Sequence, residues 1–268
     1  MGIKITSSIT FLGTGADSVV IGKQLRSAGG IIIQINNNQF HLNPGPGALP
    51  AAKQYEINLR ENTSIFVSDT SIYNSNDINA VIDAMTYSGF DKKGVLIAAK
   101  DVISENVSDF YKNCLERYIA IEPPQKVAIN EVEIQALKTT HPATSCIGFK
   151  FFAPEFTITY ASTTKYSSEI TEQYKNSNIL VLNIPTLEKN EKGLSKEGAI
   201  KIINAARPKL VVITGFGIKM IESDPTYEAR EIQKASGVQV VAAKDGMVIN
   251  PVSYSAEKGQ KTLKSSFK

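Results

Sequence analysis

Histidine and cysteine are scarce in this chain of 268 residues, which contains two of each. Cys114 and Cys146 are too few and too far apart for a disulfide framework or a zinc knuckle. Free cysteine is among the most often buried residue types, so we expect two buried thiols. The two histidines, His41 and His141, exclude a site built from several imidazoles.

Long apolar runs are also missing from the chain. No stretch approaches the roughly 20 residues that a membrane-spanning helix needs, so we expect no membrane segment. Residues 1–6 lead into a strand-like segment without a secretory pattern, which predicts a cytoplasmic protein. Hydrophobic residues make up 42% of the chain and charged residues 21%, and these values are typical of a globular protein rather than a disordered one.

Positive charge is concentrated at the C-terminus. Four lysines and one glutamate in residues 256–268 account for the whole formal net charge of +3. These lysines are Lys258, Lys261, Lys264 and Lys268. We interpret residues 1–253 as a folded domain and residues 254–268 as a flexible basic tail. Such a tail can bind nucleic-acid phosphates through its lysines, and a solvated terminus without a partner is the alternative.

Periodicity and β-forming residues predict strands in both halves of the chain, with helices between them. The predicted strands are 3–12, 30–35, 39–42, 65–67, 94–99, 126–139, 148–152, 157–161, 179–183, 210–214, 238–243 and 248–249. The predicted helices are 75–86, 195–206 and 224–235, and residues 100–127 fit either a helix or a lid-like excursion. No linker-like tract divides the chain, so we expect one layered α/β domain.

Several segments, taken in order, resemble the metallo-β-lactamase superfamily. The matching segments are Phe11–Gly15, Gly29–Ile33, His41–Leu49, Ser75–Ala80, His141–Phe151, Thr159–Thr163 and Thr214–Met220. The resemblance covers about residues 10–250 and implies a four-layer αββα sandwich in a single domain. It also implies ancestry from enzymes that hold two metal ions, usually zinc, with five histidines and two aspartates, and that use a metal-activated water.

Most of the ligand positions implied by this resemblance carry other residues. The metal motif falls at Asp69, Ser71, Tyr73 and Asn74, the fourth histidine at His141, the bridging aspartate at Thr163 and the last histidine at Gly215. Zinc needs nitrogen, sulfur or carboxylate donors. Asp69 and His141 are the remaining candidate metal ligands, and we expect Asp77 to cap or precede its own helix. We therefore predict no cofactor, with a weakly bound divalent ion as the alternative.

The loss of ligands favours a non-catalytic protein of this fold that acts as a binding or assembly subunit. Its partner would be a nucleic acid or a protein, including an intact catalytic relative, in a homo- or hetero-oligomer. The alternative is a hydrolase of phosphodiester or ester substrates with a remodelled, metal-poor site. That site would lie around Asp69, Tyr73 and His141. A separate possibility makes Ser71 the nucleophile, His141 its base and Asp69 the orienting group. The structural alternative makes Asp69 a brace of its own turn.

Three other features have two interpretations each. Gly13–Ser18 begins like a dinucleotide-binding loop, but Ser18 replaces the third glycine and a strand-like segment follows, so we interpret it as a structural turn. Lys219 either faces the cleft, where it would meet an anionic ligand, or is a solvated lysine. We interpret four aromatic residues as sheet core or sheet face rather than as a surface for base stacking: Phe151, Phe152, Phe156 and Tyr160.

Overall fold

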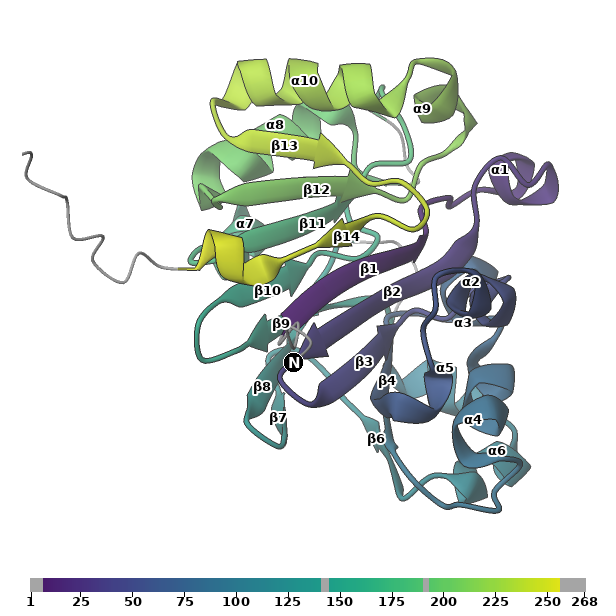
Figure 1. The fold of residues 1–268 in the computed structure, drawn as a ribbon. Helices are drawn as coiled ribbons and strands as arrows, with labels where there is room; N and C mark the ends of the chain where they lie inside the picture. Colours follow the sequence, from purple (N-terminus) through teal and green to yellow (C-terminus); the bar gives the residue numbers. More distant parts are fainter. Residues whose placement is uncertain (1–6, 141–144, 190–192, 256–268) are drawn as a thin grey trace, which may run out of the picture.

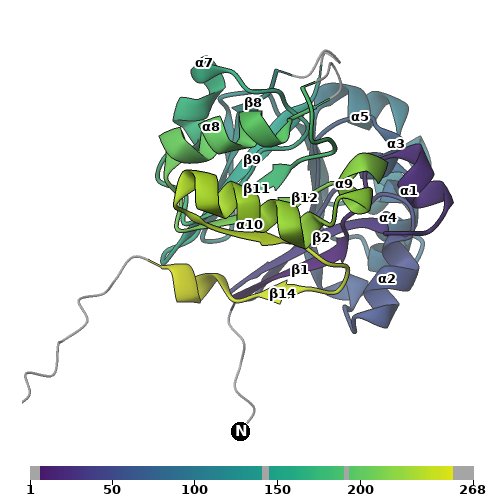
Figure 2. The ribbon, with the colours of Figure 1, turned by 90° about the horizontal axis from the view of Figure 1, so that it is seen from above.

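The computed structural model describes residues 7–140, 145–189 and 193–255. Within these residues, two seven-stranded sheets lie face to face (Figure 1). Helices α2, α4 and α5 lie on one side of the strands and α7, α8 and α10 on the other (Figure 2). The predicted four-layer αββα sandwich in a single domain is confirmed.

The first sheet has the strand order β14-β1-β2-β3-β4-β5-β6. Its strands are β1 (Ser7–Gly13), β2 (Ala28–Ile35), β3 (Asn38–Leu42), β4 (Asn62–Val67), β5 (Val95–Ala98), β6 (Arg117–Ala120) and β14 (Val248–Ile249). β2 is antiparallel to β1 and β3, and β3 to β6 are parallel. The C-terminal ends of β1, β3, β4, β5 and β6 therefore reach the same edge of the sheet.

The second sheet repeats this plan with the order β13-β12-β11-β10-β9-β8-β7. Its strands are β7 (Lys126–Ile129), β8 (Val132–Lys138), β9 (Ile147–Phe152), β10 (Thr157–Tyr160), β11 (Ile179–Asn183), β12 (Leu210–Thr214) and β13 (Gln239–Ala242). β7 to β10 are antiparallel and β10 to β13 are parallel. A bridge between Gly15 and Phe216 joins the strand ends of the two sheets.

Ten α-helices and three short 3₁₀ turns lie within the described residues. The helices are α1 (Ser18–Gly22), α2 (Ala48–Gln54), α3 (Ile72–Ser75), α4 (Ile78–Thr86), α5 (Lys100–Glu105), α6 (Asp109–Cys114), α7 (Ser168–Thr171), α8 (Lys196–Ala206), α9 (Ile218–Glu222) and α10 (Pro225–Ser236). The 3₁₀ turns are Leu59–Glu61, Glu172–Tyr174 and Pro251–Tyr254. None of these helices is long and apolar enough to span a membrane.

Phenylalanines from both sheets form the centre of the core. The ring of Phe66 in β4 lies 5.4 Å from that of Phe149 and 5.2 Å from that of Phe151, both in β9. Phe40 in β3 stacks on Phe151 at 5.9 Å. All four side chains are fully buried, and each contributes about 2 to 3 kcal/mol through removal from water. Phe151 is therefore core, as predicted.

Several element boundaries differ from the prediction. The predicted helix 75–86 begins at Ile78 as α4, and the separate helix α3 ends at Ser75. Between them the Asp77 amide donates to Pro44 O at 2.9 Å, and the Asp77 carboxylate accepts the amides of Gly47 and Ala48 at the start of α2. Asp77 thus precedes its own helix but caps a different one. Residues 100–127 form α5, α6 and β6 rather than a lid.

Two further predictions about local structure are wrong. Residues 126–139 are a hairpin of β7 and β8 that turns at Asn130, whose φ is +52°. The segment after Gly15 is the short helix α1, capped by the Asp17 carboxylate, rather than a strand. At five residues, α1 is too short to show helical periodicity. β2 is antiparallel to β1, so no βαβ unit of the dinucleotide-binding kind follows the Gly13–Gly15 turn, as predicted.

Candidate functional site

A small cavity opens where the strand ends of the two sheets meet. Its volume is about 40 Å³. The walls come from Gly13–Ala16 after β1, Asn43 after β3, Tyr73 and Asn74 in α3, and Tyr160, Asn183, Thr214 and Gly215 at the ends of β10, β11 and β12. We refer to it as the strand-end cavity. Four of the residues singled out from the sequence line it: Tyr73, Asn74, Tyr160 and Gly215.

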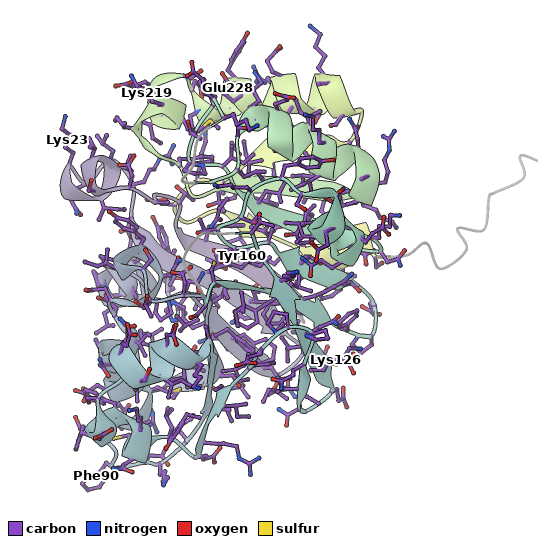
Figure 3. The ribbon with its side chains drawn as sticks, turned by 180° about the vertical axis from the view of Figure 1, so that it is seen from behind. Lys23, Phe90, Lys126, Tyr160, Lys219 and Glu228 are labelled. Carbon is purple, nitrogen blue, oxygen red and sulfur yellow. The ribbon has the colours of Figure 1, made fainter. Side chains whose placement is uncertain are left out.

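Tyr160, which Figure 3 labels in the middle of the molecule, is the centre of a buried hydrogen-bond network at this cavity. Its hydroxyl accepts hydrogen bonds from Asn43 Nδ2 at 3.0 Å and from Asn183 Nδ2 at 2.9 Å. Asn43 Oδ1 in turn accepts the Ser68 amide at 2.8 Å. Burial raises the pKa of the Tyr160 hydroxyl far above its usual value, and Asp69 adds to the rise. The network is therefore uncharged at neutral pH, and it ties β3 of one sheet to β10 and β11 of the other.

Asp69 follows β4 and braces the turn that leads into α3. Its carboxylate accepts the Ser71 amide at 2.9 Å and both oxygens accept Asn74 Nδ2, at 3.0 and 2.9 Å. Asn74 lies at a predicted ligand position, but its side-chain amide donates hydrogen bonds to the Asp69 carboxylate. The side chain of Asp69 is already committed within its own turn, which is the structural alternative predicted from the sequence.

Ser71 is an N-cap residue. Its hydroxyl oxygen accepts the Tyr73 amide at 3.4 Å at the start of α3. Asp69 contacts the backbone amide of Ser71 rather than its hydroxyl. This geometry gives a helix cap and does not give a nucleophile oriented by a carboxylate. His141, the proposed base, lies outside the described residues.

Cys146 is a site residue that the sequence did not single out. Its Sγ lies 3.4 Å from Asp69 Oδ2 and 3.4 Å from Ser162 Oγ, and it donates to Thr163 O at 3.3 Å. Burial, and then the negative charge of Asp69, raise the pKa of this thiol to about 12. Cys146 is therefore a protonated, buried thiol, as predicted for a free cysteine, and it is far from the thiolate that a reactive cysteine requires. Its place in the segment that begins at His141 was the available signal.

Gly215 and Asn183 share one space at the ends of β12 and β11. Gly215 has a φ of +64°, and a Cβ atom at this position would lie 2.9 Å from Asn183 Cγ. A side chain at position 215 therefore requires Asn183 to move. Thr163, the other late ligand position, contributes its carbonyl to Cys146 and follows Ser162, whose φ is +57°.

Solved structures with the same arrangement of sheets identify the fold. The metallo-β-lactamase fold protein YhfI of Bacillus subtilis superposes with a TM-score of 0.76 over 91% of this chain and 98% of its own, at 15% identity. The chain has the metallo-β-lactamase fold.

Two further solved structures and one relative found by sequence are also similar to this chain. Zinc-bound PqqB of Methylobacterium extorquens superposes with a TM-score of 0.71 over 90% of this chain and 99% of its own, at 11% identity. The short form of human tRNase Z superposes with a TM-score of 0.68 over 90% of this chain and 98% of its own, at 14% identity. An uncharacterised protein of Methanocaldococcus jannaschii is 28% identical over 252 residues, which are 90% of this chain and 94% of that one. No protein-family model matches the chain.

The residues of this metallo-β-lactamase-fold site do not fit a two-metal centre. Within the described residues, no group of three or more His, Cys, Asp or Glu side chains is gathered to hold a metal ion. Both oxygens of Asp69 are bound by Asn74, Cys146 is protonated, and Gly215 has no side chain. Amides and hydroxyls are poor donors for zinc.

Two other sequence candidates lie away from the cavity. His41 is completely buried in β3, where its Nε2 donates to Gly29 O at 2.9 Å. Lys219 in α9 projects into solvent and pairs with Glu222 at 3.4 Å, so it is the solvated lysine of the two interpretations (Figure 3).

Proposed function

We propose that this protein is a non-catalytic binding protein of the metallo-β-lactamase fold. The observation that supports this most is the Asn43–Tyr160–Asn183 network, which joins the two sheets by uncharged hydrogen bonds at the ends of their strands. A two-metal centre would hold the same strand ends by coordination and would supply a reactive water. Here the amides and the phenol keep the two sheets together without supplying a nucleophile.

The commitment of Asp69 is a second line of support. A general base must reach the proton that it removes and must be free to accept it. Asp69 accepts three hydrogen bonds from its own turn and is buried, with 8% of its surface exposed. Ser71 and Asn74 are equally occupied with capping and bracing. Asp69, Ser71 and Asn74, at three of the predicted ligand positions, therefore stabilise the turn and the start of α3.

Hydrolysis remains the second candidate function, because similar solved structures include a diphosphatase of the PhnP family and human tRNase Z. The test is a panel of a phosphodiester, a lactone and a thioester substrate, each assayed with supplied Zn²⁺ or Mn²⁺ and again after chelation. We expect no turnover above a heat-denatured control. Turnover that disappears on chelation would contradict the proposed binding role.

For a partner, we propose that the basic tail beyond Ser255 adds nucleic-acid affinity. Each lysine that neutralises a phosphate releases a counterion, so four lysines steepen the dependence of binding on salt. Log affinity falls as log salt concentration rises. Deleting residues 256–268 should make this negative slope shallower by about 3 for single-stranded RNA. An equal slope for the full chain and the truncated chain would exclude a role for the tail and favour a protein partner, such as a catalytic relative, as the object of assembly.

A further inference from the structure

We propose that the strand-end cavity binds an uncharged polar group, of which a primary carboxamide is the simplest example. This inference rests on the proposed binding function and specifies the chemical class of its ligand. It depends on three properties of the cavity: its neutral lining, the carboxylates around it, and the polar atoms that have no partner there.

The first property is the absence of charge on the lining. Every described residue that lines the cavity is glycine, alanine, isoleucine, threonine, asparagine or tyrosine. Tyr160 is kept in its neutral form by burial. A charged ligand would lose its hydration shell without gaining an oppositely charged partner, which costs several kcal/mol.

The second property is a set of three carboxylates that contact the lining residues or their neighbours. Asp245 accepts Thr14 Oγ1 at 2.6 Å and the Ser27 amide at 2.7 Å. Asp17 accepts the amides of Val20 and Ile218, each at 2.7 Å. Asp69 is the third. Among the described residues, none of the three forms an ion pair with lysine or arginine, so their negative charge opposes an anionic ligand.

These carboxylates do not make a cation site either. Each carboxylate oxygen accepts a hydrogen bond from the protein, and none of the three aspartates is itself a lining residue. A cation in the cavity would therefore meet amides and hydroxyls but no free carboxylate. The surroundings exclude an anion and give a cation no partner, which leaves a neutral ligand as the favoured class.

The third property is unused hydrogen-bonding capacity. Asn74 and Asn183 use their NH₂ groups on Asp69 and Tyr160, and within the described residues their side-chain oxygens accept no hydrogen bond. The Tyr160 hydroxyl accepts two hydrogen bonds, and its own hydrogen is donated to no described residue. A carboxamide offers N–H donors to the two asparagine oxygens and a carbonyl to the Tyr160 hydroxyl.

The size of the cavity limits what enters it. A volume of about 40 Å³ is a few times the roughly 10–15 Å³ that a cavity needs to hold one water molecule. The bound group must therefore be the end of a ligand rather than a whole cofactor. For a free probe of three non-hydrogen atoms, the tightest dissociation constant expected is about 1 mM.

The test uses three probes of one shape and different charge: formamide, formate and formamidinium. Each is titrated at constant ionic strength into the full ¹⁵N-labelled chain, and the amide resonances of Gly15, Gly30 and Gly215 are followed. We expect saturable shifts with formamide and at least tenfold weaker binding of the two ions. Equal or tighter binding of formate or formamidinium, or no binding of formamide, would overturn the inference.

A charge placed in the lining should change the preference. Asn183→Asp keeps the shape of the side chain and adds a carboxylate beside Tyr160, so formamidinium should bind at least tenfold more tightly than formamide. Asn176→Asp adds the same charge on an exposed turn and should leave the wild-type order unchanged. An unchanged order in a folded Asn183→Asp variant would contradict the assignment of the site.

The failure of this inference is distinguishable from that of the proposed function. A protein without metal or hydrolytic activity that ignores all three probes contradicts only the ligand class. A protein that hydrolyses substrates with a bound metal contradicts the proposed function, whatever the probes do.

Discussion

At the scale of single residues, hydrogen bonds from amide groups hold the side chains at the ends of the strands. Tyr160 accepts hydrogen bonds from two side-chain amides. Asp69 accepts three hydrogen bonds from two donors, the Ser71 amide and Asn74 Nδ2. Such buried polar groups are stable only when their partners are present, because an unsatisfied donor or acceptor costs about 1 to 3 kcal/mol. The residues at this site are therefore coupled, because substituting one leaves the hydrogen-bonding groups of its neighbours without a partner.

Tyr160→Phe tests this coupling. The substitution removes the acceptor of Asn43 and Asn183 and leaves two buried amide groups without a partner, so we expect the free energy of unfolding to fall by about 2 to 3 kcal/mol. Urea denaturation followed by circular dichroism measures it. Tyr118→Phe, on the exposed edge strand β6, is the control and should change stability by less than about 0.5 kcal/mol. Equal losses in the two variants would show that the network contributes nothing.

Gly215→Ala tests the space shared with Asn183. The new methyl group would add a contact of 2.9 Å with Asn183 Cγ to the strain of a φ of +64°, and we expect a loss of about 2 to 4 kcal/mol. Gly237→Ala is the matched control, since its φ is +68° and nothing lies within 4 Å of the added Cβ. That variant should lose only about 1 to 2 kcal/mol. Similar losses, measured by the same denaturation, would mean that Asn183 adjusts without cost.

At the scale of secondary-structure elements, the long amphipathic and β-rich segments were predictable, and the short ones were not. The strand ends of β10, β11 and β12 and the capping of α10 by Asp224 and Gly237 follow from local sequence signals. Helices α1 and α3 do not, since four or five residues carry no helical period. The break between α3 and α4 depends on Asp77 binding α2, which is a tertiary contact that local sequence does not encode.

Strand β3 contains a histidine whose burial has a consequence for pH. Burial lowers the pKa of His41 from 6.5 to about 4, more than the Gly29 carbonyl and Asp77 raise it. Below pH 6.5 the unfolded chain binds a proton that the native state does not, so stability falls as the pH is lowered from 6.5 to about 4. The loss approaches about 3 kcal/mol.

His41→Gln isolates this effect, because glutamine cannot titrate and retains a donor for the Gly29 carbonyl. The difference in unfolding free energy between the two proteins should change by about 3 kcal/mol between pH 7 and pH 4. Chemical denaturation at several pH values measures it. A difference that stays constant across this range would show that burial does not shift the pKa of His41 in the native state.

At the scale of the whole molecule, the order of the segments predicted the fold. The contacts between residues at the site could be found only from the structure. The resemblance places predicted ligand positions at Asp69, Ser71, Tyr73, Asn74, Thr163 and Gly215, and this assignment stays a prediction. The roles of Cys146 and Asn183 were not visible, because each depends on contacts between strands that are distant in the chain. His141 and residues 256–268 of the basic tail lie outside the described residues, and their roles stay predictions.

The most direct test of a metal-independent site is the metal content of the purified protein. Elemental analysis by mass spectrometry should follow expression with zinc and manganese supplied in the medium and gel filtration without chelator. We expect well below one equivalent of any transition metal per chain, unchanged in a His141→Ala variant. Two equivalents of zinc or manganese per chain, reduced by that substitution, would contradict the central claim.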